Sequence, residues 1–218
     1  TLSHYNCDYF GVAVADEGVE LRKAGIKTPI IIMNPELNTF DLMIKYRLEP
    51  EIYSFKLLKS FANYTENEGI NNFPIHIKID TGMHRLGFEE KEIDSLIDFL
   101  KNNKSLKVES AFSHLVAAED KNEDEFTLKQ IETFKRITDK LQNELNITFL
   151  RHILNTSGIQ RFSEYQMEMV RMGIGLYGIG IDENSPIRPV ATLKTRILQI
   201  KELGAEETVG YNRKGKLN

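Results

Sequence analysis

Short apolar runs alternate with longer amphipathic stretches along most of this 218-residue chain. The apolar runs have the length of β-strands, and stretches such as 89–103 and 123–145 repeat apolar residues at the spacing of one helix face. Strands that alternate with helices form βαβ units, so the pattern predicts a parallel sheet covered by helices. We expect seven strands, at residues 9–15, 29–33, 51–54, 73–80, 107–114, 147–154 and 167–174.

Seven such units are one short of the eight that close a (β/α)₈ barrel. The sequence opens on what reads as the tail of a helix, so we interpret it as a piece of a longer protein. We predict an α/β fold: strands 2–8 of a TIM barrel over residues 1–186, then the start of a C-terminal β domain over 187–218. In that domain, residues 190–203 are expected to form a long strand. A flavodoxin-like or Rossmann sheet is the alternative, because it gives the same alternation.

Composition excludes several classes of partner. The net charge is −4, so nothing favours nucleic acid or an anionic membrane surface. No apolar run reaches the length of a membrane span. The single cysteine, Cys7, cannot build an internal disulfide framework and suits a reducing compartment, so we expect a cytoplasmic protein without nucleic-acid or membrane partners.

Polar side chains gather where the later predicted strands end, which is the side on which barrel enzymes carry their active sites. Four consecutive strands end in such residues: Lys78, Asp80 and Arg85, then His114, then His152 with Asn155, and finally Arg171. One such residue alone is more often a cap or a salt-bridge partner. Four successive strand ends together predict a functional site.

Two further motifs carry less weight. The segment "GIGLYG" (173–178) matches the G-x-G-x-x-G dinucleotide fingerprint, but that motif should follow the first strand and open a helix. A metal site built from His114, His152 and Asp80 lacks any close ligand spacing, so we expect no metal.

Five motifs resemble, in order and spacing, those of alanine racemases, the fold-type III pyridoxal-phosphate enzymes. They are "KIDTGMHRLGF", "FSHLVAAED", "HILNTSGIQRF", "VRMGIGLYG" and "VGYNRKG". The resemblance implies a homodimeric isomerase that binds pyridoxal 5'-phosphate and inverts a small amino acid by moving its α-proton between two bases. It also implies that the product, D-alanine, supplies peptidoglycan for the cell wall.

The resemblance assigns the catalytic roles as follows. Tyr211 is one of the two bases, and a chain of contacts runs from it through His114 and Arg171 to His152. Arg171 also faces the pyridine nitrogen of the cofactor. Because a guanidinium only donates hydrogen bonds, that nitrogen would stay unprotonated.

The remaining roles concern the cofactor phosphate and the substrate. The phosphate is expected at the Thr156 hydroxyl and the backbone N–H groups of Gly173 and Ile174, with Asn155 also in the cofactor site. Arg85 would steady the substrate carboxylate. Lys78 matches a lysine that is often carbamylated in the family, a change that turns a costly buried cation into an anion able to hold Arg85.

One family residue has no counterpart here. The lysine that anchors the cofactor belongs to a Lys-x-x-x-Tyr-Gly motif, which does not occur in these 218 residues. We therefore expect this stretch of chain alone to be inactive. The alternatives are a broad-specificity racemase for serine or lysine, and a non-catalytic barrel that carries pyridoxal phosphate. Residues 190–218 argue against the carrier, because that family ends with the barrel.

Overall fold

A computed structural model describes residues 2–180 and 187–216. The chain divides into two compact units, one up to Arg188 and one from Pro189 onward. The predicted domain boundary, at residue 186, lies outside the described residues.

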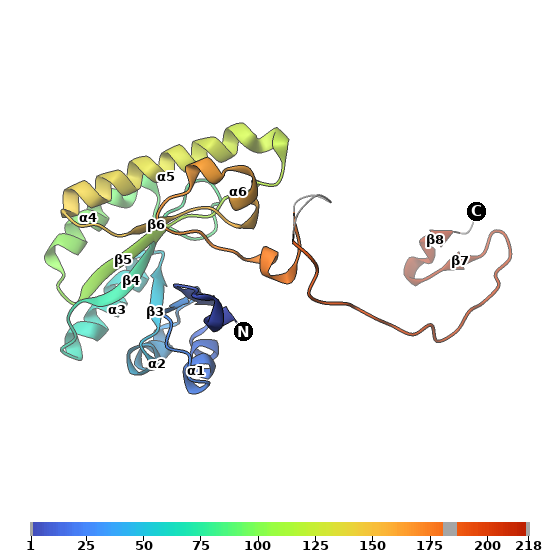
Figure 1. The fold of residues 1–218 in the computed structure, drawn as a ribbon, viewed down its shortest axis with the longest axis horizontal. Coiled ribbons are helices and arrows are strands. Elements are labelled where there is room, and N and C mark those ends of the chain that lie inside the picture. The colour runs from blue at the N-terminus through green and yellow to red at the C-terminus, as the bar shows by residue number, and fades with distance from the viewer. Residues whose placement is uncertain (1, 181–186, 217–218) are drawn as a thin grey trace. The chain divides into compact units, whose positions relative to one another are not determined.

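The first unit is a sheet of six parallel strands with its helices. The strands are β1 (Phe10–Val12), β2 (Ile30–Ile32), β3 (Glu49–Ile52), β4 (Phe73–Lys78), β5 (Leu106–Phe112) and β6 (Leu150–His152). The helices are α1 (Ala15–Lys23), α2 (Phe40–Tyr46), α3 (Phe55–Asn67), α4 (Ile93–Asn102), α5 (Asp124–Leu145) and the short α6 (Thr156–Arg161). Figure 1 shows the sheet curling into part of a barrel, with α1 to α5 on its outer side.

Each strand pairs with the next one along the chain, in the order β1 to β6. A flavodoxin-like or Rossmann sheet reverses its strand order near the middle, whereas a barrel keeps it sequential. The observed order therefore excludes the doubly wound alternative and confirms the parallel α/β prediction. The described residues form an incomplete barrel.

The two faces of the sheet differ in polarity, as β4 shows. Ile75 and Ile77 are fully buried in the apolar core, whereas His76 and Lys78 alternate with them and lie among polar side chains. Successive side chains of a strand point to opposite faces, so the apolar series faces the helices and the polar series faces the concave interior.

A shift in register between β4 and β5 aligns this polar series with its neighbours. Ile75 lies opposite Val108, but His76 lies opposite Ser110, so β5 gains one residue at this point. Such a bulge changes which face of the sheet the following side chains of that strand point to. As a result Ser110 lies beside His76 on the inner face.

Both long predicted helices are present. In α5, Ile131, Phe134, Ile137 and Leu141 are buried as expected, but Phe126, in the first turn, is 36% exposed. The Phe126 ring lies beside Gly82 in the loop after β4, whereas its neighbour Thr127 is fully buried. Ion pairs such as Arg136–Glu90 join α5 to the chain around α4, but exposed pairs of this kind contribute at most about 1 kcal/mol each. The buried apolar side chains hold this helix layer in place.

Two predicted strands do not form. Residues 167–174 make two backbone contacts with β6 and its extension, from Met169 N–H to Arg151 O at 3.3 Å and from Arg171 N–H to Leu154 O at 3.0 Å. Among the described residues no strand lies on the other side of this segment, and two bonds do not build a ladder. Residues 190–203 likewise have no paired neighbour among the described residues. In the second unit the paired strands are β7 (Thr208–Val209) and β8 (Gly215–Lys216), with a 3₁₀ turn at Tyr211–Arg213 between them.

The loop that follows β4 is closed tightly at its base. Phe88 N–H donates to Lys78 O at 2.9 Å, and Asp80 N–H donates to Phe88 O at 3.0 Å. Gly87 has a φ of +130°, and a Cβ there would lie 2.6 Å from the backbone nitrogen of Asp80. Glycine is therefore required for the loop that carries Arg85 to close.

We predict that Gly87→Ala lowers the free energy of unfolding of the full-length protein by about 2–4 kcal/mol, from backbone strain and overpacking together. Gly11→Ala is the matched control, since no atom lies within 4 Å of its added Cβ. Urea unfolding measures both variants. Equal effects of the two substitutions would contradict the closed-loop explanation.

Candidate active site

A cavity of about 480 Å³ lies at the carboxyl ends of the strands. Its lining comes from the loops that follow β4 and β5, from the start of α6 and from the segment 174–180, and includes Met83, His114, Asn155, Thr156 and Ile174. Four of these five were predicted as site residues. Parallel strands bring their following loops together at one end of a sheet, which explains why residues so distant in sequence share one cavity.

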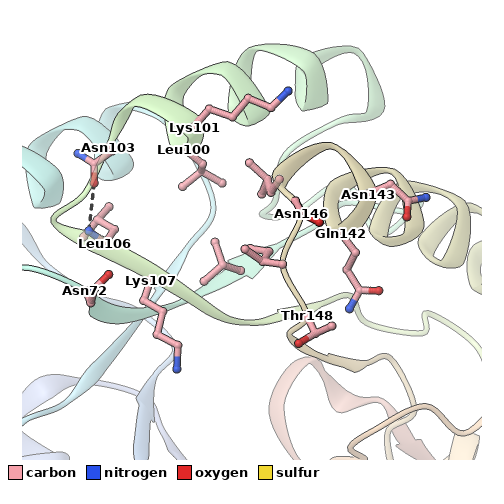
Figure 2. A pocket seen from close by; sticks show the side chains of 13 residues that line it. Asn72, Leu100, Lys101, Asn103, Leu106, Lys107, Gln142, Asn143, Asn146 and Thr148 are labelled. Carbon is pink, nitrogen blue, oxygen red and sulfur yellow. Dashed lines mark hydrogen bonds between the residues drawn. The ribbon is translucent and has the colours of Figure 1, made fainter.

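A cavity of about 930 Å³ lies at the opposite, amino ends of the strands. Figure 2 shows that its side chains come from the ends of α4 and α5, from the start of β5, and from Asn72 and Thr148, which precede β4 and β6. They are amides, lysines, aliphatic groups and the Thr148 hydroxyl, without an imidazole, carboxylate or thiol. This cavity therefore lacks the imidazole group that the cavity at the carboxyl end has.

Arg171 is the most extensively bonded side chain of the site. Its Nη1 donates to His152 Nδ1 at 2.7 Å and to His152 O at 2.9 Å. Its Nη2 donates to Ser113 O at 2.6 Å, with Ile153 O at 3.4 Å. Burial lowers the pKa of Arg171 to about 10, partly offset by Glu51, so the guanidinium remains charged at neutral pH. Only Nε–H has no acceptor among the described residues.

His152 is held between Arg171 and an aromatic ring. It is buried and stacks on Phe112, with ring centroids 4.8 Å apart and planes 7° apart. Burial, followed by the charge of Arg171, lowers the pKa of His152 well below 6.5, so the imidazole is neutral. Because a guanidinium cannot accept a hydrogen bond, Nδ1 of His152 accepts and the ring proton is on Nε2.

Lys78, the last residue of β4, is buried beside Glu51. Its Nζ lies 3.9 Å from a Glu51 carboxylate oxygen and 4.3 Å from the centroid of the Phe112 ring. Burial lowers the pKa of Lys78 to about 8, against the opposing effect of Glu51. Burial also raises the pKa of Glu51 to about 7, against the opposing effect of Lys78. Near neutral pH the neutral form of each group is therefore more populated than it would be in water.

His114 is half-buried in the cavity, and its pKa is lowered to about 4, mainly by burial and then by the charge of Arg171. Within the part of the chain that the structure describes, His114 makes no hydrogen bond with Arg171, which bonds the preceding carbonyl, Ser113 O, instead. The predicted contact between His114 and Arg171 is thus not a hydrogen bond in this structure, although the charge of Arg171 acts on the imidazole. The predicted contact between Arg171 and His152 is present as a 2.7 Å hydrogen bond.

The expected phosphate site is organised by Thr156 at the start of α6. Its Oγ1 accepts from Gly173 N–H at 3.2 Å and from Gly175 N–H at 3.1 Å. Asn155 caps the helix, with its Oδ1 accepting from Gly158 N–H at 3.0 Å. Of the two predicted backbone donors, Gly173 N–H is thus engaged, and Ile174 N–H has no acceptor among the described residues.

Two other predicted residues have exposed side chains. Arg85 is exposed in the loop after β4. Tyr211 belongs to the second unit, where its side chain is 98% exposed, and its approach to His114 stays a prediction.

Sequence reasoning missed five residues of the inner face: Glu49, Glu51, His76, Ser110 and Phe112. The available signal was a run of polar residues at alternate positions of otherwise apolar strands, as in "LEPEI" and "PIHIK". Among residues 2–180 and 187–216, no group of three or more His, Cys, Asp or Glu side chains is placed to hold a metal ion. Within those ranges no helix has the length and apolarity that crossing a membrane requires.

Sequential parallel βα units, with basic side chains and a cavity at the carboxyl ends of the strands, define a barrel-type α/β protein. The family model described as "Alanine racemase, N-terminal domain" matches residues 1–180. The chain belongs to this family.

Named relatives agree with this assignment. The alanine racemase of Fusobacterium nucleatum is 36% identical over 222 residues, which cover 97% of this chain and 58% of that protein. A solved alanine racemase of Clostridium difficile 630 superposes with a TM-score of 0.80 at 30% identity, over 98% of this chain and 57% of the other. An alanine racemase from Bartonella henselae "with covalently bound pyridoxal phosphate" gives a TM-score of 0.82 at 25% identity, with 98% and 58% covered. The chain thus spans a little over half the length of these relatives.

The lowered pKa of His114 predicts acid sensitivity. Between its ordinary value of 6.5 and about 4, the unfolded chain binds a proton at His114 that the folded chain does not. The free energy of unfolding should therefore fall as pH is lowered through this range, and His114→Gln should flatten the decline. Urea unfolding from about pH 7 to about pH 4 measures both slopes. His4→Gln, at an exposed position, is the control, and an unchanged slope for His114→Gln would contradict the assignment.

Proposed function

We propose that the full-length protein is a pyridoxal-phosphate-dependent alanine racemase. The observation that carries this proposal is the Arg171 guanidinium, which His152 and two strand-end carbonyls fix at the carboxyl end of the sheet. The family assignment and the relatives named alanine racemase support it. Homodimer formation, supply of D-alanine for peptidoglycan and a cytoplasmic location remain parts of the same proposal.

The residues present suit the cofactor. The cavity of about 480 Å³ falls within the usual range for sites that bind small molecules. Thr156 and the unengaged Ile174 N–H offer donors for a phosphate, and the unengaged Nε–H of Arg171 offers one for a ring nitrogen. When bound, the cofactor stabilises the negative charge that forms when the α-proton leaves the substrate.

Arg171 then determines how strongly the ring attracts electrons. A guanidinium donates a hydrogen bond but does not give up its proton at neutral pH, because its pKa is still about 10 here. A ring nitrogen bonded to Arg171 would stay unprotonated, which makes the ring a weaker electron acceptor. The arrangement favours return of the α-proton over side reactions such as transamination.

Proton transfer on one face is assigned to Tyr211. In one direction its phenolate would take the α-proton from its own face while the anchoring lysine gives a proton to the other face, and in the reverse direction the two roles exchange. His114 is neutral at physiological pH because its pKa is about 4, so it can relay or accept a hydrogen bond rather than add another cation to the cavity. Arg85 is assigned to the substrate carboxylate.

Lys78 is proposed as a carbamylation site. Only the neutral amine attacks CO₂, and a pKa of about 8 makes that form available near neutral pH. Formation of the carbamate releases a proton, which Glu51, 3.9 Å away and with a pKa of about 7, can take up. The carbamate would then hold Arg85. A ¹³C NMR spectrum of the full-length protein equilibrated with ¹³C-bicarbonate at neutral pH tests this, since the absence of a carbamate signal that Lys78→Arg removes would refute it.

The purified full-length protein with cofactor should convert L-alanine to D-alanine faster than it racemises serine or lysine, as followed by chiral chromatography. Tyr211→Phe should slow racemisation by roughly 10²–10⁴-fold, the usual contribution of a positioned acid–base group, with cofactor absorbance retained. Deuterium uptake from solvent should become one-sided. Tyr5→Phe, at an exposed tyrosine, is the matched control.

Each contrary result points to a defined alternative. Faster turnover of serine or lysine would favour the broad-specificity racemase. Tight cofactor binding without any racemisation would favour the carrier protein. Near-normal rates in both directions for Tyr211→Phe would remove Tyr211 as a base.

A further inference from the structure

A chain of hydrogen bonds runs from Arg171 across the inner face of the sheet, through side chains that the mechanism above does not use. His152 Nε2 lies 2.9 Å from Ser110 Oγ, and Ser110 Oγ lies 2.6 Å from His76 Nδ1. His76 Nε2 lies 2.8 Å from a carboxylate oxygen of Glu49. Strands β6, β5, β4 and β3 thus contribute one residue each to a continuous relay.

The relay is buried along its middle. Ser110, His76 and His152 are almost completely shielded from solvent, and only the terminal Glu49 side chain is 13% exposed. Buried polar groups are nearly always hydrogen-bonded, because a missing partner leaves the desolvation penalty uncompensated. The removal of one link should therefore disturb its neighbours.

Arg171 sets the direction of every bond in the relay. Because the guanidinium only donates, His152 accepts at Nδ1 and carries its proton on Nε2, which donates to Ser110 Oγ. The Ser110 hydroxyl then donates to His76 Nδ1, and His76 Nε2–H donates to the Glu49 carboxylate. Every donor has an acceptor in this arrangement. The reverse direction would place two donors 2.7 Å apart at Arg171.

We propose that Ser110, His76 and Glu49 are positioning residues for Arg171, which hold His152 in the Nε2–H tautomer that accepts from the guanidinium. The hydrogen bond made by one imidazole nitrogen sets the protonation of the other, and such outer partners orient functional side chains. The effect of this positioning on catalysis rests on the proposed function, whereas the tautomer of His152 can be established independently of it.

The test is the tautomer of His152 and His76, read from two-bond ¹H–¹⁵N spectra of the full-length protein labelled with ¹⁵N-histidine. Ser110→Ala removes the link between the two imidazoles. Ser105→Ala is the matched control, because Ser105 is also a buried serine near β5 but is bonded to Thr65. We expect a pure Nε2–H tautomer for His152 in the wild type and in Ser105→Ala. In Ser110→Ala the buried Nε2–H has no acceptor, so we expect part of the protein to break the bond from Arg171 and adopt the Nδ1–H tautomer, which gives mixed spectra.

Catalysis supplies the second readout. Ser110→Ala should lower kcat about tenfold, the effect of losing one buried hydrogen bond, while KM changes less than about twofold. If Ser110→Ala does not fold, Glu49→Leu removes the partly exposed end of the relay instead. That variant should shift His76 toward its Nδ1–H form.

Three results would overturn the proposal: an Nδ1–H tautomer of His152 in the wild type, spectra of Ser110→Ala or Glu49→Leu that match those of Ser105→Ala, and an unchanged kcat despite mixed tautomers. A protein with the expected tautomers that does not racemise alanine would support the relay and refute the proposed function instead.

Discussion

The hydrogen bond between Arg171 and His152 is the contact on which the arrangement of the site depends. A guanidinium can only donate, so this 2.7 Å contact fixes where the imidazole proton lies. The same guanidinium joins the carbonyl that follows β5 to the end of β6, since it bonds both Ser113 O and His152 O. One side chain thus sets both the electrostatics of the site and the alignment of two strand ends.

Charge balance on the inner face explains why so many ionisable groups can be buried there. The Glu51 carboxylate lies beside Lys78 and offsets the charge of Arg171. Arg171 is also linked to the Glu49 carboxylate by the hydrogen-bonded relay of neutral side chains. Lys78 and Glu51 each have a pKa displaced toward neutrality, so the pair can lose its charge rather than remain buried as isolated ions. The apolar face of the sheet, packed on the helices, supplies the stability that this polar face lacks.

Periodicity was sufficient to predict the parallel α/β architecture, helices α4 and α5 and the clustering of strand-end residues. It could not predict the relay, because Ser110 meets His76 only through the register shift in β5, and a bulge leaves no local sequence signal. The prediction of a strand at 167–174 was wrong because it, too, depended on contacts with other parts of the chain. A strand is defined by its neighbours, and this segment bonds only the β6 side. Glu51 could not be paired with Lys78 from sequence, because the two residues lie on different strands and only the fold brings them together.

The most direct test of this account is the protonation state of the cofactor's ring nitrogen in the full-length protein. It can be measured from the ¹⁵N chemical shift of bound pyridoxal 5'-phosphate labelled at that atom. If Arg171 faces the ring as a donor, the nitrogen should be unprotonated at neutral pH, and Arg171→Glu should protonate it. A protonated nitrogen in the wild-type protein would contradict the account.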